Sequence, residues 1–359
     1  MPMSKNLADE PMTYTKEDLQ ARFPQNEVIV DAHGAPSVMV YVPMFRMCDV
    51  VDGGSDTPHP AFIADGKVLP GIYISKFQNT VADGCACALP DADPAAQIDY
   101  DAASRLCTEK GAGWHMMTAA EWGAVALWCR KNGWLPWGNN DWGKDYRENE
   151  SRAKISYEDR EAGVCRTATG SGPIEWSHNR CEDGIWDLNA NVWEWIAGLR
   201  LVFGELQFCD GTDEKWYALD GLTGERVTPN GNGTTHGTVK LDYVDGIWTY
   251  TSGQVTDSLA KARFCDFADV RTDGTLCPAV TEYLIALGLL PDHRGDDIAG
   301  VSLYANNGAR ERMPFRGGRW GQGANAGVFK TCLDDPRHFS AHAVGFRAVY
   351  VPPQYGEKL

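Results

Sequence analysis

The chain has 359 residues, of which 43% are hydrophobic and 23% are charged, a composition typical of a globular protein and unlike that of a disordered one. Its 33 Lys and Arg residues against 49 Asp and Glu residues give a net charge of -16, which repels nucleic acid and anionic membrane surfaces and argues against both as ligands. No run of about 18 apolar residues occurs, so we expect no membrane insertion.

The amino-terminal part of the chain predicts a polar extension followed by strands. Residues 1–26 are polar and charged and are interpreted as an N-terminal extension. They contain one short helix, which begins after Thr15 and has Asp18 near its start, where the two side chains can cap the helix end. Strands are predicted at residues 27–30, 37–42 and 70–77, the last with the alternation of apolar and polar residues that a half-buried strand shows.

Two helices and a block of loops follow. Asp99 is a suitable N-cap for a helix that ends at Gly111. Thr118 and Glu121 form a capping box for a second helix, which carries apolar residues every three or four positions and ends at Gly133. The next segment is dense in Trp, Gly and Asn, which indicates irregular loops held by large aromatic side chains.

Residues from about 197 to 305 have a different pattern, and we interpret them as an inserted subdomain within a domain that spans residues 27–359. Apolar residues on either side of Asp245-Gly246 predict a hairpin with a favoured turn dipeptide. A short helix is predicted after Pro278.

The carboxyl-terminal part combines two regular anchors with an irregular interval. Residues 315–318 (Phe-Arg-Gly-Gly) offer a large apolar group and backbone freedom, and residues 344–350 alternate as in a terminal strand with one buried face. We expect this strand to pair with the strand at 38–42. Between the anchors the side chains follow neither a period of 2 nor one of 3.6.

This interval, about residues 319–343, predicts a binding site rather than a catalytic one. Fixed ends around chemically mixed side chains suit a surface that displays them to a ligand, and the alternative is an ordinary hairpin with a polar loop. We expect the interval to be exposed to solvent, so that changes at Gln322, Lys330 or His342 have little effect on melting. The candidate ligand-binding residues are Arg319, Gly321, Gln322, Lys330, Thr331, Cys332, Asp334, Asp335, His338, Phe339, Ala341, His342 and Ala343.

The first residues and the cysteines indicate where the protein is made and whether its thiols are reduced. The segment from Met1 to Glu10 contains no apolar run, so we expect a protein that is made in the cytoplasm without a signal peptide. Eleven cysteines at irregular spacing are then expected to stay reduced.

An ordered set of motifs runs through the chain at residues 42–47, 73–77, 115–122, 187–195, 315–318 and 345–347. In this order they resemble the formylglycine-generating enzyme (sulfatase-modifying factor) branch of the C-type lectin-like fold. Residues 187–195 are similar to that family's Gly-Asn-Val-Trp-Glu-Trp motif, with Ala190 in place of the glycine. The resemblance covers most of residues 36–352 apart from the insertion, and it implies an α/β (α+β) C-type lectin-like fold of the formylglycine-generating enzyme subtype.

Within that fold, residues 318–330 place arbitrary residues among fixed glycines and aromatics. This ending resembles the variable proteins of diversity-generating retroelements, some of which are phage receptor-binding proteins. The resemblance implies a diversified protein whose variable region engages a protein or glycan receptor on another cell, as part of a phage tail or on a displayed surface. It also implies several copies, in a homo-oligomer or a virion.

Two alternatives follow from the same resemblance. A formylglycine-generating oxidase uses two nearby cysteines and copper, whereas Cys332 is the only cysteine after Cys277 and the histidines do not cluster in sequence. We therefore expect no catalytic residue and no enzyme activity. A carbohydrate-binding lectin is the second alternative, in which Trp137 or Trp142 would stack on a sugar, although the calcium-dependent sugar motifs are absent.

The resemblance also implies a calcium site near the Trp-Glu-Trp motif. Asp187 and Glu194 would offer carboxylates there, and the main-chain carbonyls of Ala190 and Val192 would complete the site. Two carboxylates fall short of the six to eight oxygens that calcium takes, so we favour the alternative in which no cofactor is bound and Glu194 bonds to the neighbouring chain.

Overall fold

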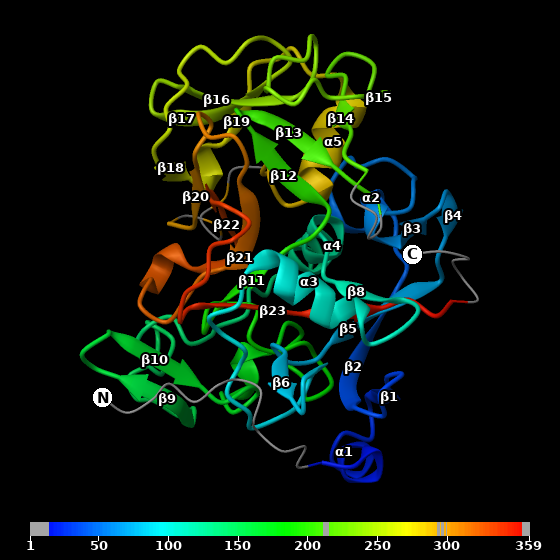
Figure 1. The fold of residues 1–359 in the computed structure, drawn as a ribbon, viewed down its shortest axis with the longest axis vertical. Helices are drawn as coiled ribbons and strands as arrows, with labels where there is room; N and C mark the ends of the chain where they lie inside the picture. The colour runs from blue at the N-terminus through cyan, green and yellow to red at the C-terminus, as the bar shows by residue number, and fades with distance from the viewer. Residues whose placement is uncertain (1–13, 211–214, 293–294, 296–297, 299, 354–359) are drawn as a thin grey trace.

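The computed structural model describes residues 14–210, 215–292, 295, 298 and 300–353 (Figure 1). Within these residues strands predominate over a few helices, and the chain is a mixed α/β structure built on open sheets. None of the helices in these ranges has the length and apolar character needed to cross a membrane. Residues 1–13 of the expected N-terminal extension lie outside the described part, as do residues 354–359 at the end of the expected domain.

The first sheet brings together strands from both ends of the chain, in the order β1-β2-β5-β24-β8. Its strands are β1 Glu27–Val30, β2 Pro36–Pro43, β5 Gly71–Ser75, β24 Ala348–Tyr350 and β8 Trp114–Met116. The three strands predicted at 27–30, 37–42 and 70–77 are confirmed, with small differences at their ends. Alternation along β5 places Ile72 and Ile74 in the largest core cluster.

The second sheet has six strands in the order β18-β20-β22-β21-β11-β23. They are β18 Arg263–Asp266, β20 Ser302–Ala305, β22 Gly327–Asp335, β21 Met313–Gly317, β11 Trp193–Trp195 and β23 Val344–Phe346. Helix α4 (Ala119–Lys131) and strand β22 are joined by the indole N–H of Trp122, which donates to the backbone oxygen of Val328 at 2.6 Å. β22 therefore runs through the interior, with a strand on each side and a helix side chain bonded to it.

The predicted terminal strand at 344–350 is divided between these two sheets. β23 pairs in parallel with β11, whereas β24 pairs with β5 and β8. The expected direct pairing with the strand at 38–42 is therefore wrong, because β5 lies between β2 and β24.

Arg347 lies between β23 and β24, where the strand passes from the second sheet to the first. Its guanidinium donates to both carboxylate oxygens of Glu194 at 2.8 Å, and to the backbone oxygens of Ser75 and Trp186 at 2.8 and 2.9 Å. A buried cation needs such partners, and these come from β5 of the first sheet, from β11 of the second sheet and from Trp186, which lies outside both. Arg347 thus bonds to both sheets where the strand passes from one to the other.

Residues 199–272 supply all five strands of a third sheet, in the order β12-β13-β16-β17-β19. They are β12 Leu199–Val202, β13 Glu205–Phe208, β16 Lys240–Val244, β17 Ile247–Thr251 and β19 Arg271–Thr272. The hairpin predicted at Asp245-Gly246 is confirmed, since β16 pairs with β17 and the two turn residues have φ of 53° and 81°. β18 and β20 come from the same expected insertion but join the second sheet, as Figure 1 shows.

Short ladders and helices complete the described structure. The ladders pair β3 Ile63–Ala64 with β4 Lys67–Val68, β6 Thr80–Ala82 with β7 Cys85–Cys87, β9 Ile155–Asp159 with β10 Val164–Thr167, and β14 Ala218–Leu219 with β15 Arg226–Val227. The helices are α1 Lys16–Arg22, α2 Met47–Val50, α3 Tyr100–Thr108, α4 Ala119–Lys131 and α5 Pro278–Ala286, with single turns η1 Pro60–Phe62, η2 Ile174–Trp176, η3 Phe267–Asp269 and η5 Gly323–Asn325. The caps predicted at Thr15, Asp99 and Thr118 are confirmed, because each side chain accepts a backbone N–H of its helix.

Candidate functional site

A cavity of about 230 Å³ lies on one face of the second sheet, and seven of the candidate binding residues line it. Its floor is a row across three strands, in which Tyr304 of β20 is opposite Cys332 of β22, which is opposite Phe315 of β21. Residues opposite each other on neighbouring strands project from the same face. We call this the aromatic cavity, and its lining is Trp193, Tyr304, Phe315, Arg319, Gln322, Cys332, Asp335, Phe339, Ala341, Ala343 and Val344.

The structure divides the candidate residues into two groups. The first group is exposed or partly exposed: Arg319, Gly321, Gln322, Asp334, Asp335, His338, Phe339, Ala341 and His342. The second group is buried: Lys330, Thr331, Cys332 and Ala343. The expectation that the whole interval is exposed is therefore wrong for these four, and for the first three the reason is that β22 has a strand on both sides. Cys332 and Ala343 nevertheless reach the wall of the aromatic cavity.

Lys330 is a cation placed against the aromatic wall. Its Nζ bonds to the hydroxyl of Ser302 and lies 4.4 Å from the ring centre of Tyr304 and 5.9 Å from that of Trp193. Burial lowers the pKa of Lys330 to about 8. The ammonium group is thus stabilised chiefly by ring faces and one hydroxyl, as cation–π contacts permit.

Cys332 and Asp335 form the polar part of the floor. Burial raises the pKa of the Cys332 thiol, and the carboxylates of Asp335 and Asp334 add to the effect. The thiol lies 3.9 Å from Oδ2 of Asp335. Burial, followed by Asp334, raises the pKa of Asp335 to about 6. A thiol held in its neutral form is a poor nucleophile and a poor metal ligand.

The loop between β22 and β23 is held by the surrounding chain through its own carbonyl oxygens. Four donors from other parts of the fold reach it. Three are backbone N–H groups: that of Tyr100 donates to the oxygen of Arg337 at 3.1 Å, that of Gln97 to Ala341 at 2.8 Å, and that of Trp193 to Ala343 at 2.7 Å. The fourth is the guanidinium of Arg166, which donates to the oxygen of His342 at 3.0 Å. These contacts use main-chain oxygens, which every residue carries. Two side chains of the loop make contacts as well: the Arg337 guanidinium lies 2.7 Å from Asp101 and 3.4 Å from Glu311, and the His342 ring lies 3.0 Å from the amide of Gln97.

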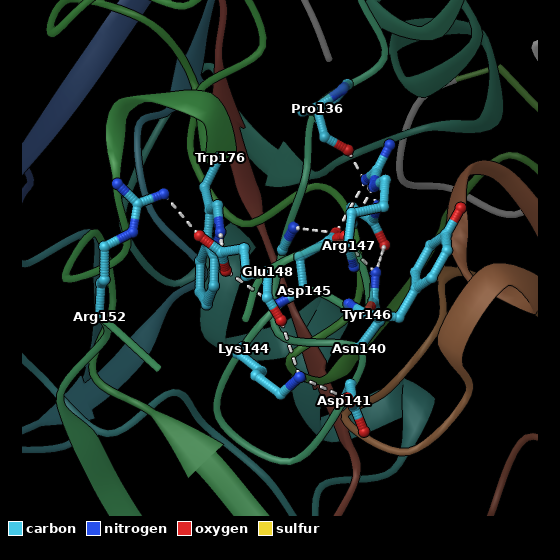
Figure 2. A network of polar contacts seen from close by, with 12 residues as sticks. Pro136, Asn140, Asp141, Lys144, Asp145, Tyr146, Arg147, Glu148, Arg152 and Trp176 are labelled. Atoms are coloured by element: carbon cyan, nitrogen blue, oxygen red, sulfur yellow. Dashed lines mark hydrogen bonds and ion pairs between the residues drawn. The ribbon is translucent and has the colours of Figure 1, made fainter. Parts of the chain in front are cut away.

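The second loop of the site, residues 318–326, rests on the Trp-, Gly- and Asn-rich block. The N–H of Gly323 donates to the backbone oxygen of Asn140 at 2.9 Å, and the indole N–H of Trp320 donates to Gly163 at 3.0 Å. Figure 2 shows the polar network that fixes the block: the buried Asp145 carboxylate accepts from Asn140 at 2.8 Å and from Arg147 at 2.6 and 2.8 Å. The predicted aromatic anchors are also present, since Trp134 stacks on Trp137 with ring centres 6.0 Å apart, whereas the polar network was not predicted.

Trp142 extends the site beyond the interval read from the sequence. Its side chain is 52% exposed, and a β-carbon placed on Gly321 would lie 3.3 Å from its ring. Phe264 flanks the opposite part of the cavity, stacked on Tyr304 with ring centres 5.0 Å apart, and is 58% exposed. Sequence reasoning missed Phe264, Tyr304 and Trp193 as members of the site, because only strand pairing brings them to it.

The calcium site implied by the resemblance does not fit the residues present. Both oxygens of Glu194 are bonded to Arg347. The Nε2 amide of Gln78 lies 3.0 Å from Oε1 of Glu194 and 3.2, 3.1 and 2.9 Å from the backbone oxygens of Asp187, Ala190 and Val192. A protein amide therefore occupies the centre of the oxygens that would have surrounded a cation.

A larger cavity, about 730 Å³, lies elsewhere and contains none of the candidate residues. Its polar lining includes His115, whose Nε2 is 2.8 Å from Oε1 of Glu121, and Asp210, which is ion-paired with Arg226. His115 and Glu121 are explained by the capping of α4, in which the other Glu121 oxygen accepts the N–H of Thr118 at 2.7 Å. Among the described residues, no three His, Cys, Asp or Glu side chains meet in a metal-binding arrangement.

No protein-family model and no curated protein matches the chain. Among solved structures, the chain is similar to Treponema denticola variable protein 1, with 11% identity and a TM-score of 0.35 over 91% of this chain and 99% of that one. It is also similar to the U1 and P3c variants of the Major Tropism Determinant, with 10% and 12% identity and a TM-score of 0.31 for each, over 88% of this chain. The chain spans 63% of the length of those two proteins. A likeness at this level does not assign a function.

Proposed function

We propose that this chain is a diversified binding protein with a C-type lectin-like domain of the formylglycine-generating enzyme type, extended by an insertion at about 197–305. Its binding face is formed by the exposed part of residues 319–343 together with the aromatic cavity. The face binds a protein or glycan receptor on another cell, from a phage tail or a displayed surface, and several copies act together. The ordered motifs of the sequence support the fold and the kind of protein.

One observation carries the proposal: the loop between β22 and β23, which bears five of the thirteen candidate residues, is fixed by bonds to its carbonyl oxygens. Four donors from outside the loop reach Arg337, Ala341, His342 and Ala343. A surface of this kind keeps its shape when its side chains change, which is what a diversified binding site requires.

We further propose that the chain has no oxidase activity. Cys332 is the one late cysteine, and burial raises the pKa of its thiol, which disfavours the thiolate that copper binding and substrate oxidation would need. Incubation with a cysteine-containing peptide and copper, followed by mass spectrometry, should give no aldehyde. Turnover that disappears in Cys332→Ser would reverse this part of the proposal.

The binding face is tested by randomising it. A display library varies the accessible candidates at once: Arg319, Gln322, Asp334, His338, Phe339 and His342. We expect most members to fold, as judged by protease resistance on the display particle, and selection against a panel of protein and glycan targets to yield specific binders.

A matched library is the control. It randomises six exposed residues distributed over other surfaces: Lys67, Val68, Leu222, Glu225, Thr228 and His236. It should fold equally well and give no binders from the same panel. Equal recovery from both libraries would show that the first set is not a specialised face. The proposal also makes an expectation about the genome. A near-copy of the codons for about 315–350, which differs from them at adenines, should lie beside a reverse-transcriptase gene.

A further inference from the structure

The size of the aromatic cavity limits what it can hold. At about 230 Å³ it is smaller than the roughly 300–1,000 Å³ of sites that enclose a whole small-molecule ligand. It therefore suits one ring or one side chain. Its walls are mostly carbon, with four aromatic residues and three aliphatic ones: Trp193, Tyr304, Phe315, Phe339, Ala341, Ala343 and Val344.

The polar side chains of the cavity carry opposite charges. Arg319 contributes a cation, Asp335 a carboxylate and Gln322 a neutral amide. Among the described residues no cation lies within ion-pair distance of the Asp335 carboxylate, although the charge of Arg312 acts to lower its pKa, and its hydrogen-bond partner is the thiol of Cys332 at 3.9 Å. Charge complementarity then favours an occupant without net charge that offers Asp335 a hydrogen-bond donor.

A cationic side chain is a poorer occupant because a cation is already present. The ammonium of Lys330 lies 4.4 Å from the ring centre of Tyr304 and 5.9 Å from that of Trp193. A second positive charge in the cavity would lie near this ammonium group, and like charges repel.

A sugar ring is a poorer occupant because of its hydroxyl groups. Each hydroxyl that is buried in the cavity needs a hydrogen-bond partner, or its burial costs free energy. Besides the thiol, the tyrosine hydroxyl and the indole N–H of Trp193, the lining offers the polar ends of Arg319, Gln322 and Asp335. A phenol ring has one hydroxyl to pair with this set, whereas a sugar ring has four or five, and each of them must find a partner in the right direction.

We propose that the aromatic cavity is an anchor pocket for a tyrosine side chain of a protein partner. The phenol ring packs among Phe315, Phe339 and Trp193, and its hydroxyl donates to the Asp335 carboxylate. This inference rests on the proposed function. Of the two kinds of receptor proposed there, it favours a protein over a glycan. Buried tyrosines in desolvated pockets are among the side chains that dominate binding free energy at protein interfaces.

The rim of the cavity suits a protein surface. Phe264, stacked on Tyr304, is 58% exposed, and Trp142, beside Gly321, is 52% exposed. Exposed aromatic side chains on the two flanks of a small pocket extend the apolar area well beyond the reach of one occupant ring. A partner that inserts tyrosine would cover both flanks with the chain around it.

The experiment uses four small probes and the whole protein with ¹³C-labelled alanine methyl groups. The probes are p-cresol for tyrosine, toluene for phenylalanine, butylguanidinium for arginine and methyl glucoside for a sugar. We expect p-cresol to shift the methyl signals of Ala341 and Ala343 in a saturable way and to bind more tightly than the other three. Tighter binding of butylguanidinium or methyl glucoside would overturn the proposal.

Three variants locate the binding. Asp335→Asn replaces a charged acceptor by a neutral one and should weaken p-cresol about fivefold while toluene binding stays unchanged, because charged acceptors form bonds about twice as strong. Ala341→Leu fills the cavity and should abolish p-cresol binding. Ala324→Leu, at an exposed position of η5 outside the cavity, is the matched control and should leave it unchanged. Persistence of p-cresol binding in a folded Ala341→Leu variant would place the probe elsewhere and reject the pocket.

The tyrosine pocket and the proposed function are tested by different experiments, and either one can fail without the other. The probe experiment involves no receptor, so it reports on the cavity alone. If p-cresol does not bind while the display library still yields binders, the face is correct and the tyrosine pocket is wrong. If p-cresol binds and the library yields nothing, the pocket is real but does not serve a diversified face.

Discussion

At the scale of single residues, the amide of Gln78 lies among four oxygens, and this leads to a test by metal addition and removal. Gln78→Glu puts an oxygen where the amide N–H groups now face Glu194 and three backbone oxygens, so the variant should melt at a lower temperature in EDTA. Added calcium should restore part of that loss, because a hard cation binds such an oxygen cluster.

The unaltered protein is the control for this prediction. It should melt at the same temperature in EDTA and in excess calcium, as followed by circular dichroism. A melting temperature that rises with calcium in the unaltered protein would mean that Asp187 and Glu194 bind the cation directly.

Asp187 should make the protein less stable as the pH rises. Burial raises the pKa of its carboxyl from 3.8 to about 6, while one oxygen accepts the N–H of Gly170 at 2.9 Å and the other has no partner in the described residues. The folded state then binds more protons than the unfolded state between these values. The stability that the neutral carboxyl provides at low pH is therefore lost as the pH rises through about 6.

The size of this effect is about 3 kcal/mol, because each unit of pKa corresponds to about 1.4 kcal/mol. Asp187→Asn keeps the acceptor for Gly170 and cannot ionise. The unfolding free energy of both proteins is measured in urea. From about pH 4 to pH 7 the variant should gain about this much stability relative to the unaltered protein. A difference that does not change with pH would contradict the shifted pKa.

At the scale of elements, β22 shows what the sequence hides. Helix caps such as Thr118 with Glu121 join residues three positions apart, so the local sequence is enough to find them. Lys330, Thr331 and Cys332 look like surface residues in the same local view. They are buried because β20 and β21 flank their strand, and because Ser302, far away in sequence, takes the Lys330 ammonium. No periodicity within β22 could reveal those neighbours.

This burial changes the expected mutational pattern. Trp320→Ala and Phe346→Ala should each lower the unfolding free energy by about 3–5 kcal/mol, as large aromatic truncations in a core do. Gln322→Ala and His342→Ala should stay within about 0.5 kcal/mol. Lys330→Ala should fall between the two groups, at about 2 kcal/mol, because it removes a buried side chain whose ammonium contacts Tyr304, Trp193 and the hydroxyl of Ser302.

Urea unfolding of the five variants measures this ordering. A Lys330→Ala variant as stable as Gln322→Ala would mean that Lys330 lies on the surface, as the sequence alone suggested. A stable Trp320→Ala variant would mean that the second loop is not fixed by its aromatic anchor.

At the scale of the whole molecule, the largest gap between sequence and structure lies in the expected insertion. Its hairpin and its helix after Pro278 were predictable from local signals, and both are present. Its contribution to the site was not predictable, because Phe264 and Tyr304 reach the cavity only through the pairing of β18 and β20 with β22. Local patterns give elements, whereas pairings between distant strands decide which elements share a surface.

Arg347 is a buried contact between the first two sheets. Arg347→Leu leaves the Glu194 carboxylate buried without its cation and should cost about 3–5 kcal/mol. The double variant Arg347→Leu with Glu194→Leu removes both charges and should be more stable than the sum of the two single losses predicts. Urea unfolding of all four proteins gives the coupling, and strict additivity would show that the pair does not act as a unit.

The bonds that hold the loop between β22 and β23 have a consequence for its coding sequence. All four use the carbonyl oxygens of Arg337, Ala341, His342 and Ala343 as acceptors. Every amino acid keeps that oxygen, proline included, since proline lacks only the N–H. No missense change in these four codons can delete an acceptor, so each attachment point remains available whichever amino acid the gene encodes there.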